Sequence, residues 1–141
     1  MMTNRDVCFI DSSAFLALNN PSDVNHRQAY EIAQRLSLFR FVVTDAVITE
    51  TYALLRYRLG FHTARRFLEL VLRSGEYDIA EITPPLRMEA MRLLERYNDH
   101  KISYCDALTV VVMRQQRVEH LFAFGRHFEW MGVDLIQNRL A

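Results

Sequence analysis

Few of the features that mark specialised protein classes occur in this chain. Its 141 residues include only 4 Gly, 3 Pro and 2 Cys. This composition excludes a collagen-like repeat and a disulfide scaffold, and a content of 50% hydrophobic residues excludes a disordered chain. A formal net charge of zero excludes a strongly basic protein that coats nucleic acid, but not an enzyme that holds nucleic acid locally.

Long apolar segments are also lacking. No run approaches the ~18–20 apolar residues that a membrane span needs, and residues 1–6 are polar, without the apolar core of a signal peptide. Cys8 and Cys105 lie in apolar runs, where we expect small core residues that need no oxidising compartment. We therefore expect a cytoplasmic protein without membrane contact, folded as a single domain over residues 1–141.

Short apolar runs alternate with helical patterns along the chain. The pattern predicts strands at 7–10, 41–44, 77–82, 120–124 and 133–136. It predicts helices at 14–18, 25–38, from about 45 to Gly60, at 63–73, 84–97 and 104–116, and a helical turn at 126–131. This alternation is typical of an α/β sandwich of three layers, with a mostly parallel central sheet between helices.

Two acidic residues stand where packing alone would not place them. Asp11 ends the first strand, at the edge of the sheet where α/β enzymes bind ligands, although it could also simply cap the next helix. Glu50 has apolar neighbours three and four residues away on either side, so it should share the core-facing stripe. A carboxylate there needs a partner such as a metal ion, unless it reaches solvent or pairs with Arg56 or Arg58.

Asp106 and Asp99 extend the acidic set. Asp106 lies three residues after Ser103, in the spacing of a capping box, and opens an apolar helix that must be buried. Asp99 lies in the polar loop before it and would otherwise be a solvated side chain. Carboxylates that converge at one end of a sheet repel each other unless a cation neutralises them, and oxygen ligands suit Mg²⁺ or Mn²⁺. Such an ion can promote phosphate ester hydrolysis.

Four segments carrying these residues resemble PIN-domain ribonucleases, specifically VapC-type toxins of bacterial toxin–antitoxin pairs. The segments are residues 9–18, 47–51, 102–107 and 121–128, in the order and spacing of the family and over nearly the whole chain. The resemblance implies a PIN-like domain and hydrolysis of RNA that depends on Mg²⁺ or Mn²⁺. It implies that Asp11, Glu50 and Asp106 are catalytic metal ligands, supported by Ser12, with Asp99 as an additional acidic residue.

One position departs from the family pattern. An aromatic residue after the fourth strand is usually followed by Asp and a basic residue, whereas here Phe124 is followed by Gly125 and Arg126. A carboxylate of the site is therefore missing, and we expect weak cleavage that Gly125→Asp would raise. Asp99 or a water could also fill the gap, or Gly125 could serve a tight turn.

The function expected from the resemblance is an endoribonuclease toxin neutralised by a cognate antitoxin, in a homodimer. The alternatives are an inactive PIN module that keeps the dimer and antitoxin contacts, and a PIN nuclease of RNA processing. Arginines on the helices expected between residues 45 and 73 could bind RNA or be ordinary solvated charges. Aromatic residues on the same helices could pack in the core or form a partner interface.

Overall fold

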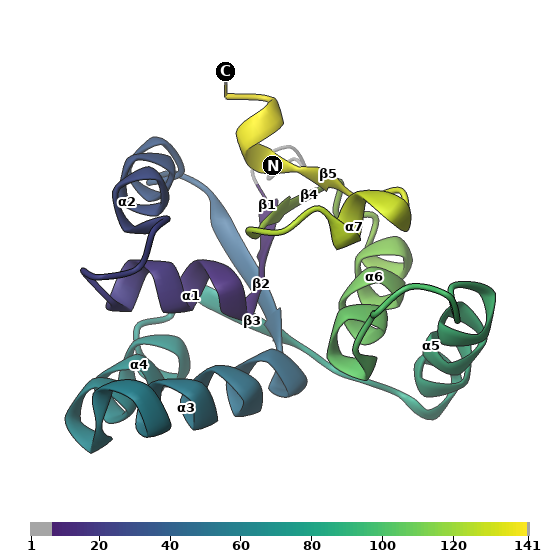
Figure 1. Cartoon of the computed structure of the whole chain (residues 1–141), viewed down its shortest axis with the longest axis horizontal. Helices are drawn as coiled ribbons and strands as arrows, with labels where there is room; N and C mark the ends of the chain where they lie inside the picture. Colours follow the sequence, from purple (N-terminus) through teal and green to yellow (C-terminus); the bar gives the residue numbers. More distant parts are fainter. Residues whose placement is uncertain (1–6, 141) are drawn as a thin grey trace.

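The computed structural model describes residues 7–140, and its centre is a five-stranded sheet (Figure 1). The strands are β1 (Val7–Ile10), β2 (Arg40–Thr44), β3 (Tyr77–Ala80), β4 (His120–Phe122) and β5 (Asp134–Leu135). Neighbouring strands pair in parallel, in the order β3-β2-β1-β4-β5. β1 lies in the middle of the sheet, which accounts for its continuously apolar sequence.

Helices cover both faces of the sheet, as Figure 1 shows. On one face lie α1 (Ser12–Asn19), α2 (His26–Arg35), α3 (Asp45–Leu59) and α4 (Phe61–Arg73). On the other lie α5 (Pro84–Arg96), α6 (Tyr104–Gln116) and α7 (His127–Trp130), and a 3-10 turn, η2 (Ile136–Asn138), follows β5. The predicted three-layer α/β sandwich is confirmed. Within residues 7–140 no helix is both long and apolar enough to span a bilayer.

Successive side chains of β1 pack in the two hydrophobic cores on opposite faces of the sheet. Phe9 packs in the core beneath α5 and α6, while Cys8 and Ile10 pack in the core beneath α1 to α4. Burial raises the pKa of the Cys8 thiol to about 12, so this thiol stays protonated, as expected of a core residue. Cys105 departs from the expectation because it is only half-buried, at the first turn of α6.

Most predicted element boundaries agree with the structure within a few residues, and the differences have local causes. The strand expected to reach Phe124 ends at Phe122, because the backbone N–H of Phe124 donates to the Ser13 hydroxyl at 2.9 Å instead of to a neighbouring strand. Helix α4 begins at Phe61, directly after Gly60. This glycine has a φ of +94°, which allows the sharp reversal between α3 and α4.

Candidate active site

Asp11 lies where β1 ends and α1 begins, at the carboxyl edge of the sheet. Its Oδ2 accepts hydrogen bonds from the backbone N–H of Ser13 at 3.1 Å and from the Ser13 hydroxyl at 2.6 Å. The residue is 3% exposed, and its Oδ1 is buried without a hydrogen-bond partner among the described residues. Asp11 therefore caps the helix with one oxygen and leaves the other free for a ligand, so the two interpretations of this residue are compatible.

The charge of Asp11 is costly in this environment. Burial raises its pKa to about 6, against the lowering effect of the two hydrogen bonds from Ser13, and the carboxylates of Asp106 and Glu50 raise it further. These electrostatic contributions are significant only between groups that lie close together. The carboxylates of Glu50 on α3 and Asp106 on α6, although distant in the sequence, thus act on Asp11 at this edge of the sheet.

Glu50 reaches the site from α3, at the margin of the buried stripe rather than in its middle. The buried residues of this helix are Val47, Ile48, Thr51 and Leu55, whereas Ala53, which we expected on the core-facing stripe, is exposed. Glu50 is half-buried, and its Oε2 accepts a hydrogen bond of 3.0 Å from the Ser12 hydroxyl. Ser12 thus orients Glu50.

Asp106 lies in the first turn of α6, where it forms the predicted capping box with Ser103. Its Oδ2 is also 3.4 Å from Nε2 of His127. Burial alone would raise the pKa of Asp106, but the hydrogen bonds with His127 and Ser103 outweigh burial and lower it. The same contact with Asp106 raises the pKa of His127, although burial of the imidazole opposes this. A carboxylate already paired in this way keeps its charge more easily than Asp11 does.

Cys105 lies next to these acids. Its thiol is half-buried, and burial raises its pKa, followed by the charge of Glu50 and a hydrogen bond with it. The thiol is therefore protonated at neutral pH and is an uncharged neighbour of the acidic cluster.

Asp99 is not brought into this cluster. Its side chain is 78% exposed and lies 3.8 Å from Nε2 of the neighbouring His100. None of the hydrogen bonds or charge interactions given by residues 7–140 joins it to Asp11, Glu50 or Asp106. A metal-binding role for Asp99 stays a prediction that no contact supports.

Gly125 has a backbone conformation that only glycine adopts easily. Its φ is +109°, and a Cβ atom added there would lie 2.9 Å from Cε1 and Nδ1 of His127. Arg126 follows at the beginning of α7, with an exposed side chain. The tight-turn interpretation of Gly125 is therefore supported, and the imidazole of His127 lies where a side chain at position 125 would begin.

Sequence reasoning missed two residues of the site, Ser13 and His127. The Ser13 hydroxyl both donates to Asp11 and accepts from the Phe124 N–H, so it ties the acid to the segment after β4. A Ser two residues after an Asp at a strand end is a local signal for such a turn. His127 could not be found in this way, because its partner Asp106 is 21 positions away in the sequence.

The donor chemistry of the cluster suits a hard divalent cation, because it offers carboxylate oxygens, one of them buried and unpartnered. In the described part of the chain, however, no three His, Cys, Asp or Glu side chains are arranged closely enough to hold a metal ion directly. The cluster can thus attract a cation and lower its own repulsion, but its side chains must approach one another to coordinate it.

Known proteins are similar in sequence to this chain over most of its length. The Mycobacterium tuberculosis protein described as 23S rRNA-specific endonuclease VapC20 is 28% identical over 125 residues, 88% of this chain and 93% of the relative. Ribonuclease VapC26 of the same organism is 28% identical over 120 residues, 84% of this chain and 87% of the relative.

Solved structures agree with this similarity. The crystal structure of Mycobacterium tuberculosis VapC20, described as a Sarcin-Ricin loop cleaving toxin, has a TM-score of 0.82 and 26% identity, over 90% of this chain and 95% of that one. FitAcB from Neisseria gonorrhoeae has the same fold, with a TM-score of 0.61 and 12% identity over 92% of this chain and 95% of that one. The PIN domain model matches residues 8–133. The chain belongs to the PIN domain family.

Proposed function

We propose that this chain is an endoribonuclease toxin that hydrolyses RNA phosphodiester bonds with Mg²⁺ or Mn²⁺. The observation that carries the proposal is the buried Asp11 carboxylate, whose Oδ1 has no hydrogen-bond partner within residues 7–140 and whose charge is opposed by Asp106 and Glu50. A carboxylate in that position is stable when a cation is bound next to it. RNA as the substrate is supported by the relatives, which are described as an rRNA-specific endonuclease and a ribonuclease.

Asp11, Glu50 and Asp106 would hold the cation, which supplies stabilisation of the charge that develops on the phosphate. The chain itself supplies the positions of these oxygens. Ser13 fixes Asp11, Ser12 fixes Glu50 at 3.0 Å, and the capping box fixes Asp106. Serine hydroxyls hold Asp11 and Glu50, and the backbone N–H of Ser103 holds Asp106, so hydrogen bonds restrain each carboxylate before any ion binds.

Partner binding is supported by apolar side chains on the helices of one face. Tyr57 at the end of α3 is 93% exposed, and Phe61 and Leu72 of α4 are about half exposed. Exposed aromatic and aliphatic groups on adjacent helices are typical of protein interfaces. We assign this surface to a homodimer or to a cognate antitoxin, and place the protein with its RNA substrate in the cytoplasm.

An inactive module is the second candidate function, and Gly125 favours it. The position lacks the carboxylate of the family pattern, and the backbone there is in a conformation that disfavours its return. Such a module would keep the fold and the partner surface but cleave RNA poorly.

Cleavage of total RNA with Mg²⁺ or Mn²⁺ tests the two candidates. We expect slow cleavage by this chain, and at least about tenfold less by Asp11→Asn or Asp106→Asn, equivalent to ~1.4 kcal/mol of transition-state stabilisation. Asp45→Asn is the matched control, because Asp45 is exposed in the first turn of α3. Equal cleavage by all variants would point to a contaminating nuclease, and no cleavage by the unaltered chain would favour the inactive module.

A further inference from the structure

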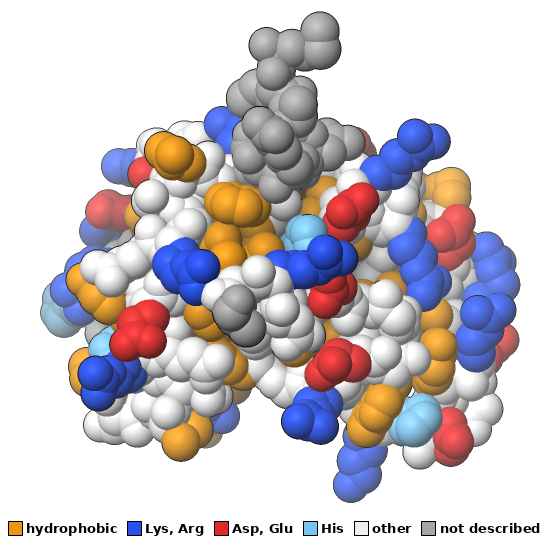
Figure 2. All heavy atoms as spheres, turned by 90° about the horizontal axis from the view of Figure 1, so that it is seen from above, with side chains coloured by type: hydrophobic (Ala, Val, Ile, Leu, Met, Phe, Trp, Pro, Cys, Tyr) orange, Lys and Arg blue, Asp and Glu red, His pale blue; other side chains and the backbone are white. Residues whose placement is uncertain are grey.

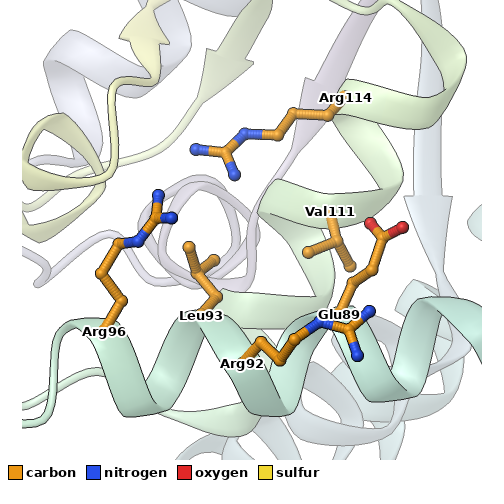
Figure 3. A pocket seen from close by; sticks show the side chains of 6 residues that line it. All are labelled: Glu89, Arg92, Leu93, Arg96, Val111 and Arg114. Atoms are coloured by element: carbon orange, nitrogen blue, oxygen red, sulfur yellow. The ribbon is translucent and has the colours of Figure 1, made fainter.

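Three arginines from two helices line one cleft on the face of the molecule formed by α5 and α6. The cleft has a volume of about 200 Å³ and is lined by Arg92 and Arg96 of α5, Arg114 of α6, and by Glu89, Leu93 and Val111. Figure 3 shows Arg96 and Arg114 pointing into the same space from their two helices. Among residues 7–140, none of these guanidinium groups lies within 4.0 Å of a carboxylate.

This arrangement leaves positive charge without compensation. The lining of the cleft holds three guanidinium groups and a single carboxylate, that of Glu89, and like charges that share a cleft repel one another unless an anion lies between them. Figure 2 shows Lys and Arg side chains on the right-hand side of the view, which carries α5, where they alternate with Asp and Glu side chains. Guanidinium groups bind phosphate oxygens in a bidentate manner, so a phosphodiester is a ligand of matching charge and geometry.

An aromatic stack adjoins the cleft. The rings of His100 and Trp130 lie 4.3 Å apart between centroids, at an interplanar angle of 30°, and Trp130 is 49% exposed. The stack is joined to the cleft through Arg114, whose Nη2 donates to the backbone oxygen of Met131 at 3.0 Å. A half-exposed ring beside basic groups is the combination that proteins use to stack the bases of single-stranded nucleic acid.

The same stack is continuous with the acidic cluster. Helix α7 carries His127 and Trp130 three residues apart, which places them on neighbouring positions of one face. His127 contacts Asp106, and Trp130 contacts His100. A chain of contacts therefore runs from the acidic cluster along α7 to the arginine cleft.

We infer that single-stranded RNA follows this route, with a base stacked on Trp130 and the adjacent backbone phosphates held by Arg92, Arg96 and Arg114. The inference rests on the proposed function and extends it by naming the path of the substrate away from the acidic cluster. An acidic peptide would pair with the arginines but has no base to stack on the aromatic rings. RNA is therefore the ligand that accounts for both features.

Fluorescence provides a direct test, because Trp130 is the one tryptophan of the chain. We expect a single-stranded RNA of about ten nucleotides, added in EDTA to prevent cleavage, to quench this fluorescence to saturation. Each phosphate contact contributes about 0.7 to the slope of log affinity against log salt concentration for single strands. Arg92→Gln and Arg96→Gln should each lower that slope by about 0.7. Arg87→Gln, on α5 but outside the cleft, should leave it unchanged.

Two variants of the stacking residue separate its role from folding. Trp130→Leu keeps an apolar side chain but cannot stack a base, and binding of a fluorescent RNA should weaken at least about fivefold. Trp130→Phe should retain most of the affinity. A loss that is equal in both variants would indicate damage to α7 and would overturn the stacking role.

Several results would overturn the path. The first is binding of RNA without quenching of the Trp130 fluorescence. The second is a change in the salt dependence of binding in Arg87→Gln that equals the change in the cleft variants. The third is a poly-glutamate peptide that binds as tightly as RNA and depends on the same arginines. Cleavage by the unaltered chain with unchanged slopes in both cleft variants would contradict this path alone. RNA that is bound with the expected slopes but not cleaved in Mn²⁺ would contradict the nuclease and support the path. Absence of any RNA binding would contradict both.

Discussion

Replacing Asp11 by Asn should stabilise the metal-free protein at neutral pH. Asp11 is 3% exposed, and the hydrogen bonds that the described residues give it reach only its Oδ2. In the absence of metal its negative charge is opposed by Asp106 and Glu50. An amide of the same shape removes this charge and still offers an oxygen to the two donors of Ser13.

The pKa of Asp11 sets the magnitude of the gain. A rise from 3.8 to about 6 corresponds to about 3 kcal/mol. Because the pKa is higher in the folded state, the protonated acid favours folding at low pH, and this stability is lost as the pH rises through about 6. Asn never ionises, so its advantage over Asp should approach about 3 kcal/mol at a pH of about 7.5 and fall to roughly half of that at a pH of about 5.

Urea unfolding in EDTA at these two pH values measures the effect. Asp45→Asn serves as the matched control, because Asp45 is exposed and its replacement should change the free energy of unfolding by no more than about 0.5 kcal/mol. If Asp11→Asn were no more stable than the unaltered chain at the higher pH, the Asp11 charge would not destabilise the fold. A gain in stability that is the same at both pH values would likewise show that the charge of Asp11 is not its cause.

Three further predictions follow from the same contacts. Mg²⁺ or Mn²⁺ should raise the melting temperature because the cation binds the folded state. Asp11→Asn and Asp106→Asn should each reduce this rise, and an equal rise in all three proteins would mean that the cation binds elsewhere. Ser13→Ala should lower the free energy of unfolding in urea by about 1–3 kcal/mol, since the partly buried N–H of Phe124 loses its acceptor, and Ser13→Thr should recover part of it. Gly125→Asp should lower that free energy by about 1–3 kcal/mol through strain at positive φ, yet raise RNA cleavage at least about tenfold per folded molecule; an undiminished stability would refute the strain.

Local patterns were sufficient to predict the layers of the fold. The continuously apolar segment of β1 predicted a buried strand of a parallel sheet, and Ser103 with Asp106 predicted the start of α6 and its capping box. These features depend on residues within a few positions of each other or on the apolar period of one element. The place of Asp11 at the carboxyl edge of the sheet followed from the end of that strand.

Features that depend on contacts between distant elements were not accessible in this way. Helical periodicity placed Glu50 with Ala53 on the core-facing stripe, but α3 packs on α1 and α4 through a different set of residues, which leaves Ala53 exposed and Glu50 at the margin. Periodicity fixes which residues share a face but not which face the neighbouring helices cover. Asp99 likewise is close to Ser103 in sequence, but its loop directs the side chain to solvent.

The environment of Gly125 shows why the missing carboxylate cannot be treated as a simple deletion. Comparison with the family pattern presents Gly125 as one lost side chain, but the structure couples it to His127, whose imidazole lies 2.9 Å from where a Cβ would be. That imidazole in turn contacts Asp106, which raises the pKa of His127, so a hydrogen-bond donor faces the acidic cluster where the family pattern has a carboxylate. Asp at position 125 would both displace His127 and change the charge next to Asp106. The cost in stability and the gain in cleavage expected of Gly125→Asp therefore arise from one rearrangement. A double-mutant cycle with His127→Ala should accordingly show non-additive unfolding free energies, whereas additive values would mean that the turn and the imidazole are independent.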